Sequence, residues 1–100
     1  MVKHIVLWTL KETAGGRTAR ENALEIQARL EALNGHIPGL LTLEVGIDFG
    51  RTASSADVAL YAEFADRRAL DAYQAHPDHA AAAEFVGRVR ERRVVVDYEA

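Results

Sequence analysis

The stretch VKHIVLWTL, residues 2–10, predicts a β-strand that is apolar on both faces, and this property decides the fold. Successive side chains of a strand point to opposite sides of the sheet. Val6 and Trp8 therefore share one face, while Ile5 and Leu7 share the other. A strand with two apolar faces is typical of one that is covered from both sides. We therefore expect a cover on each side of this strand.

The rest of the chain carries the signals of alternating helices and strands. Thr18 and Glu21 form a capping box that opens a helix, and Pro77 suits the first turn of another helix. The last strand is valine-rich on both faces, like the first. The predicted elements, in order, are strand 2–10, a helix from Thr18 that ends at Gly35, strands 41–49 and 57–64, helices 66–75 and 77–90, and strand 94–98. Between them we expect a loop at 11–17 and a flexible connection at 50–56 that can act as a lid.

The order of these elements is β-α-β-β-α-β, which predicts an α+β domain of ferredoxin-like arrangement with a four-stranded antiparallel sheet. Right-handed crossovers place all the helices on one face of that sheet. Its other face is then bare, although the first and last strands are apolar there. A hydrophobic content of 49% is generous for a single domain spanning residues 1–100. We therefore predict a homodimer in which two sheets pack against each other to form an α/β barrel.

Composition excludes several classes of protein. The chain has no cysteine, so disulfide scaffolds, Cys-ligated metals and thiol nucleophiles are ruled out. A net charge of −3 argues against nucleic-acid or membrane partners. The apolar run Ile5–Trp8 is too short for a signal-peptide core or a membrane span. The expectation is a cytoplasmic domain without a cofactor.

The densest group of reactive side chains lies in the segment YQAHPDH, residues 73–79. His79 falls in the first turn of a predicted helix, whose positive end disfavours a protonated imidazole. A neutral His79 can accept a proton as a general base. Tyr73, one turn before the helix break, can hold or polarise a carbonyl group through its hydroxyl. These two residues are the predicted catalytic pair.

Structural interpretations of the same segment remain open. His76 stands before a proline, where it can serve purely as a helix cap. Tyr73 lies on the apolar side of its helix and can be a core residue. His76, Asp78 and His79 have the chemistry of metal ligands, but they lack the i, i+4 spacing of a helical zinc pair. No metal site is therefore predicted.

His4 is a second candidate, as a supporting or ligand-binding residue. The last strand runs antiparallel to the first in this topology, so Asp97 can lie beside His4 and fix the tautomer of its imidazole. The alternative is a buried pair that only specifies the strand register. Trp8 either packs in the core or lines a pocket. The basic run near the C-terminus is balanced by two glutamates and is interpreted as a solvated face; its residues are Arg88, Arg90, Arg92 and Arg93, with Glu84 and Glu91.

Several short motifs together resemble one known family, the stress-responsive dimeric α/β-barrel (Dabb) domains. The resemblance covers essentially the whole chain, and its most specific part is Tyr-x-x-His-Pro-x-His with a terminal Asp-Tyr. The matching segments are His4–Leu7, Ile37–Gly39, Asp57–Leu60, Glu63–Phe64, Tyr73–His79 and Asp97–Tyr98. The resemblance implies a ferredoxin-like fold and a dimer whose two sheets form a barrel.

Three functions are compatible with this resemblance. Many members have no established activity beyond a link to stress responses, which here implies a protein that binds a small organic ligand between sheet and helices. Others resemble plant polyketide cyclases such as olivetolic acid cyclase, which close a poly-β-keto chain without a cofactor. Their histidine base and tyrosine match His79 and Tyr73, with His4 and Asp97 in support. Cofactor-independent monooxygenases of small aromatic compounds use the same architecture. A purely structural role for the histidines, with no pocket, also remains open.

Overall fold

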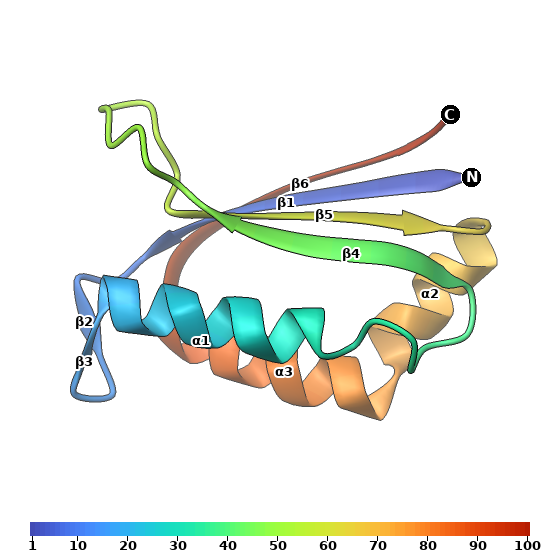
Figure 1. The fold of residues 1–100 in the computed structure, drawn as a ribbon, viewed down its shortest axis with the longest axis horizontal. Coiled ribbons are helices and arrows are strands. Elements are labelled where there is room, and N and C mark those ends of the chain that lie inside the picture. The colour runs from blue at the N-terminus through green and yellow to red at the C-terminus, as the bar shows by residue number, and fades with distance from the viewer.

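A sheet and a layer of helices on one of its faces make up the molecule (Figure 1). The computed structural model describes residues 1–100. The four antiparallel strands lie in the order β4 (Leu40–Ile47), β5 (Val58–Phe64), β1 (Val2–Leu10) and β6 (Arg90–Glu99). The helices are α1 (Ala19–Glu31), α2 (Arg67–Ala75) and α3 (Pro77–Val89). The predicted ferredoxin-like α+β fold is thus confirmed. No helix combines the length and the apolarity needed to cross a membrane.

The helices begin where their capping residues stand. The Thr18 hydroxyl accepts a hydrogen bond from the Glu21 amide at 3.2 Å, and the Thr18 amide donates to the Glu21 carboxylate at 2.9 Å. This reciprocal box satisfies two amides that the first turn of α1 leaves unpaired. The break between α2 and α3 falls at His76, whose backbone is extended because a proline follows. The predicted starts of α1 and α3 are correct.

The segment predicted as a loop at 11–17 instead contains a two-stranded hairpin, β2 (Thr13–Ala14) and β3 (Arg17–Thr18). Gly15 and Gly16 join the strands with φ values of 62° and 75°. Two successive positive φ angles are typical of the tight turn that matches the twist of a hairpin, and glycine adopts them without steric cost. Strands of two residues are too short to show an alternating pattern, so the sequence prediction missed them.

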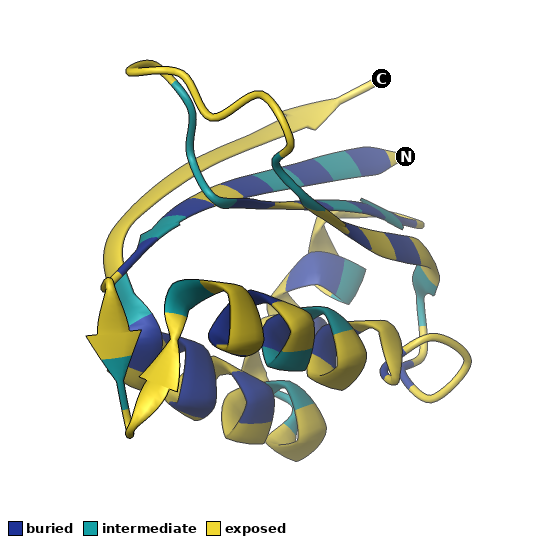
Figure 2. Cartoon of the chain, turned by 60° about the vertical axis from the view of Figure 1, so that its left-hand side comes forward, coloured by how far each residue is buried: buried dark blue, intermediate teal, exposed yellow.

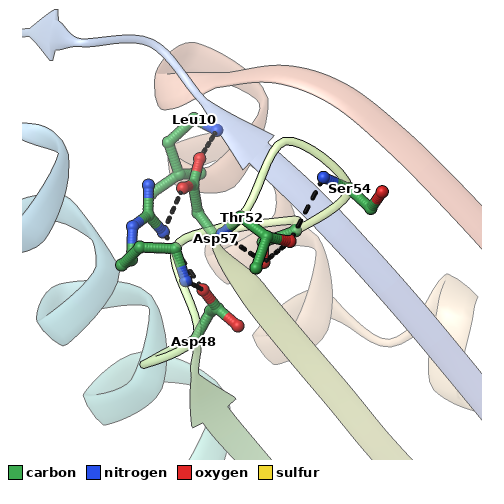
Figure 3. Close-up of polar contacts among 7 residues, drawn as sticks. Leu10, Asp48, Thr52, Ser54 and Asp57 are labelled. Atoms are coloured by element: carbon green, nitrogen blue, oxygen red, sulfur yellow. Dashed lines mark hydrogen bonds and ion pairs between the residues drawn. The ribbon is translucent and has the colours of Figure 1, made fainter.

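Side chains of the connection between β4 and β5 hold it in place (Figure 3). The Asp48 carboxylate accepts a hydrogen bond from the Arg51 amide at 2.8 Å. Asp57 accepts from the Arg51 guanidinium at 2.8 Å and from the Leu10 amide at 2.7 Å, which ties the connection to the end of β1. The connection rises from the sheet on the side away from the helices (Figure 1). Hydrogen bonds therefore anchor the connection, which was expected to be flexible.

The hydrophobic core fills the space between the helices and the inner face of the sheet, the face on which His4, Val6 and Trp8 lie. Each helix buries its sheet-facing side and exposes the opposite one (Figure 2). Phe64 and Tyr73 are among the largest fully buried side chains, with ring centroids 4.9 Å apart. This contact fixes helix α2 against β5.

The outer face of the sheet has no cover within the chain. Residues directly opposite each other in an antiparallel pair share a face, so Leu7 with Val94 and Ile5 with Val96 lie together on this side. Both faces of β6 are largely exposed (Figure 2). Val96 is 55% exposed and Phe49, just beyond β4, is 97% exposed. The surplus of apolar residues in the sequence therefore lies mainly on this outer face.

Gly39 sets how closely α2 approaches the start of β4, and its substitution should be costly. Its φ is +82°, and a Cβ there would lie 2.5 Å from the Cβ of Ala69 on α2. Gly35 has φ +80° but open space around it. We expect Gly35→Ala to cost about 1–2 kcal/mol of stability through the backbone alone, and Gly39→Ala to cost at least about 1 kcal/mol more through overpacking. Urea denaturation of both variants measures the difference; equal losses would show that α2 moves freely at this contact.

Candidate functional site

A cavity of about 320 Å³ lies between the inner face of the sheet and the helices. Ligand pockets occupy roughly 300–1,000 Å³, so this volume suits a small molecule. Its apolar wall comes from the sheet and from helices α1 and α3: Val6, Trp8, Leu60, Leu30, Ala83 and Val86. The presence of this cavity contradicts the interpretation that the histidines enclose no pocket. It also resolves the two options for Trp8, which is both buried and part of the cavity wall.

The predicted catalytic pair meets at this cavity. Tyr73 from α2 and His79 from α3 both line it, and their ring centroids are 4.1 Å apart. His4 from β1 lines the same space, with its ring centroid 6.2 Å from that of Tyr73. The helix is broken at His76, between α2 and α3. This break allows Tyr73 of α2 and His79 of α3 to contact each other. Three side chains predicted from the sequence thus converge from three different elements.

His79 is held as a neutral base. Burial lowers the pKa of His79 below its ordinary 6.5, and electrostatic interaction with His4, Arg93 and His76 lowers it further, while a hydrogen bond with the Gln74 backbone opposes the shift. Its Nδ1 is buried and makes no hydrogen bond within the protein. A neutral imidazole at neutral pH has a lone pair that can accept a proton. The sequence prediction ascribed this state to the helix end, whereas burial is the larger cause.

Tyr73 keeps its proton. Only 1% of the residue is exposed, and burial raises the pKa of its hydroxyl well above 10.0, an effect that the charge of Arg93 partly offsets. A phenol that stays protonated across the physiological range can donate a hydrogen bond to an oxygen that gains negative charge. His79 and Tyr73 therefore have complementary states, one an acceptor and the other a donor.

His4 contacts Asp97, as the strand register predicted. His4 Nδ1 lies against the Asp97 carboxylate across the β1–β6 pair, and the two residues are directly opposite in the register. A carboxylate can only accept, so Nδ1 of His4 carries a proton and donates it to Asp97. His4 is 2% exposed, while the Asp97 side chain is 38% exposed. Asp97 thus orients an imidazole that lines the cavity.

The structure does not bring His76 into the cavity. Its side chain accepts a hydrogen bond from the Asp78 amide at 3.1 Å and caps the N-terminus of α3. The structural interpretation of His76 fits this geometry, and the predicted ligand-binding role does not, because Nδ1 is already occupied. His76, Asp78 and His79 do not converge as metal ligands do, and the chain contains no group of three or more such side chains that could hold a metal ion.

Two cavity residues were missed by the sequence prediction. Arg90 and Arg93 line the cavity from β6, although the basic run containing them was interpreted as a solvated face. Arg93 lies opposite Trp8 in the register and so points to the inner side of the sheet. The alternation of the last strand could have predicted this position. Arg93, Val95 and Asp97 are spaced two residues apart, so they share one face of the sheet, the face of His4.

The titration of His79 should affect stability in a defined direction. The pKa of His79 is lower in the folded chain than in the unfolded chain, so the unfolded chain takes up the proton first as pH falls. Stability should therefore be lost below about pH 6.5, the ordinary histidine value, until the folded pKa is passed. Urea denaturation of wild type and His79→Gln between pH 8 and 5 isolates this effect. The difference in unfolding free energy between wild type and His79→Gln should change with pH. A difference that stays constant would contradict the lowered pKa of His79 in the folded chain.

Comparison with known proteins shows the family. The sequence matches the family model "Stress responsive A/B Barrel Domain" over residues 2–100. The chain belongs to this family. Its fold superposes on a dimeric ferredoxin-like protein of unknown function from Thermobifida fusca with a TM-score of 0.86 and 28% identity, covering 99% of this chain and 90% of that one. No curated protein matches the sequence.

Of two further solved structures similar to this stress-responsive barrel domain, one has no known function and the other is an enzyme. A dimeric protein of unknown function with a ferredoxin-like fold from Bacteroides fragilis has a TM-score of 0.79 and 31% identity, covering 99% and 95% of the two chains. Hydroxynitrile lyase from Passiflora edulis has a TM-score of 0.79 but only 21% identity, covering 97% and 90%. The last likeness shows the fold alone. The predicted family and fold are confirmed, and no specific activity follows from them.

Proposed function

We propose that this stress-responsive barrel domain is a homodimer in which each protomer binds a small carbonyl compound in the cavity and catalyses a cofactor-free proton transfer on it. His79 is the general base and Tyr73 is the hydrogen-bond donor. The reaction class is that of a lyase or polyketide cyclase. The single observation that supports it is the meeting of the His79 imidazole and the Tyr73 phenol at the wall of one largely apolar cavity.

The dimer is supported by the outer face of the sheet. Ile5, Leu7, Val94 and Val96 form an apolar surface across β1 and β6 that nothing in the chain covers. The polar Tyr61 of this face bonds to Glu63 at 2.5 Å, which raises the pKa of Tyr61 to about 12. Polar groups that already satisfy each other can be buried at lower cost. Relatives of 28–31% identity are described as dimeric. A second copy packed sheet to sheet is the cover that we propose.

The proposed reaction begins with a proton on a carbon next to a carbonyl group. His79 takes this proton, the C–H bond breaks, and its electron pair moves toward the carbonyl oxygen to form an enolate. Tyr73 donates a hydrogen bond to that oxygen, where the negative charge develops. In a cyclisation, the enolate carbon then attacks a second carbonyl of the same chain, and the new alkoxide takes the proton back from His79. No external oxidant or metal enters this balance.

The apolar wall serves the same chemistry. Trp8, Leu30 and Leu60 keep the reacting atoms in a region of low polarity, where a hydrogen bond to an enolate is stronger than in water. His4, oriented by Asp97, adds a second imidazole beside Tyr73. We propose that His4, which lines the cavity while Asp97 orients it from outside the lining, helps to position the ligand.

Hydrogen exchange at carbon is the simplest test of this function, because it needs only the first step. The N-acetylcysteamine thioester of acetoacetate is dissolved in D₂O, and NMR follows the loss of its α-proton signal with and without the protein. We expect the protein to accelerate exchange above the buffer rate, in proportion to its concentration. A rate equal to that of an equal concentration of free imidazole would remove the proposed proton transfer but leave ligand binding open.

A further inference from the structure

The charge of the cavity wall is opposite to that of the whole chain. The protein has a net charge of −3, yet no carboxylate lines the cavity. Its polar residues are Tyr73, His4, His79 and the two arginines of β6. When charges of one sign line a cavity with apolar walls, they concentrate the electric field on a bound molecule. The cavity is thus built for a ligand that carries negative charge.

The two arginines also lack partners within the protein. Four other arginines each lie within 4.0 Å of a carboxylate oxygen, namely Arg17, Arg29, Arg51 and Arg67. Arg90 and Arg93 make no such pair, and neither do Arg20, Arg68, Arg88 and Arg92, but only Arg90 and Arg93 of these six line the cavity. Unpaired guanidinium groups beside an apolar wall have their full hydrogen-bonding capacity available. They point to a ligand group that accepts several hydrogen bonds.

A β-bulge is the reason that both arginines reach the cavity. Trp8 pairs with Arg93 and Thr9 with Arg92, but Leu10 pairs with Arg90, so Glu91 is an extra residue in β6. In a regular strand, residues 90 and 93 would point to opposite faces. The bulge returns Arg90 to the inner side, the side of Arg93. Bulges of this kind often re-aim side chains next to functional sites.

We propose that Arg90 and Arg93 bind a carboxylate of the ligand, so that the substrate is a small organic acid with an apolar body and a reactive carbonyl. The planar guanidinium matches a carboxylate in geometry and bonds to it through two parallel hydrogen bonds. The apolar body packs against Trp8 and Leu60. Arg93 lies near enough to Tyr73 and His79 for its charge to act on both. The inference rests on the proposed function, which makes the cavity the ligand site and supplies the reactive carbonyl; the carboxylate contact itself rests on the two arginines.

A matched pair of probes tests this proposal. 4-Acetylbenzoate and 4-acetylbenzamide have the same ring and ketone and differ in the charge of one group. Trp8 is the only tryptophan and lines the cavity, so its fluorescence reports occupancy. We expect the benzoate to bind about tenfold more tightly than the amide. Arg90→Gln and Arg93→Gln should each weaken benzoate binding about two- to fivefold and leave the amide unchanged.

Arg88→Gln is the matched control, because Arg88 is exposed on α3 and does not line the cavity. It removes the same charge and should not change either affinity. Equal affinities of the two probes, or an equal loss in Arg88→Gln, would overturn the carboxylate site while the ligand cavity stands. If neither probe changes the fluorescence of Trp8, both the carboxylate site and the proposed function are overturned. A weaker dimer in Arg93→Gln with unchanged benzoate binding would assign the arginine to the interface instead.

Discussion

Replacing Val96 by glutamate should convert the protein from a dimer to a monomer. Val96 lies on the outer face of β6, opposite Ile5, and is 55% exposed in the single chain. In a dimer that packs sheet to sheet, the new carboxylate would be buried among apolar side chains without a partner. Burying an unpaired charge costs several kcal/mol, so we expect the dimer dissociation constant to rise by about 100-fold or more. Sedimentation equilibrium at micromolar concentration measures this change directly.

Leu24→Glu is the control for this prediction. Leu24 is also a large exposed apolar residue, at 45%, but it lies on helix α1, on the other side of the molecule. This variant should remain a dimer. A dimeric Val96→Glu protein, or a wild type with the mass of one chain, would exclude the sheet-to-sheet interface. The apolar outer face would then need another partner.

Replacing His79 by glutamine should lower the rate of α-proton exchange by about 100-fold or more, since a positioned base typically contributes 10²–10⁴. Glutamine is polar and close in size but cannot accept the proton as a base. Tyr73→Phe should lower the rate by about 10- to 100-fold, because the enolate loses its hydrogen-bond donor. Phenylalanine keeps the ring that packs on Phe64, so the core should remain intact. Exchange of the acetoacetyl thioester in D₂O, followed by NMR, measures both effects.

His36→Gln is the matched control, since His36 is exposed and does not line the cavity. It should exchange protons at the wild-type rate. Equal rates in His79→Gln and wild type would remove His79 as the base and direct attention to His4, the other imidazole that lines the cavity. Circular dichroism and urea denaturation of each variant separate loss of catalysis from loss of fold.

The strand order and the pairing of His4 with Asp97 were predictable because both follow from local patterns and topology. Alternation assigned the faces of β1, and the antiparallel relation of the first and last strands then placed residues 4 and 97 opposite each other. The break at His76 was equally readable, since the residue before a proline avoids the helical region. These features need no knowledge of how distant side chains pack.

The features that were missed depend on geometry that a local pattern does not contain. The bulge at Glu91 changes the face of Arg90, and only the pairing with β1 reveals it. The hairpin at Gly15 and Gly16 is too short for periodicity. The lowered pKa of His79 depends mainly on burial, which follows from the packing of α2, α3 and the sheet. Sequence patterns thus identified the candidate groups, and tertiary packing determined which of them share a cavity.

The most direct test of the ligand cavity is an NMR titration of the four histidine side chains with 4-acetylbenzoate. His4 and His79 line the cavity, whereas His36 is exposed and His76 caps helix α3. In protein labelled at the imidazole Cε1 carbons, the signals of His4 and His79 should shift and saturate, while that of His36 stays fixed. Unchanged signals of His4 and His79 at millimolar ligand, or equal shifts of all four histidines, would contradict a specific site between the sheet and the helices.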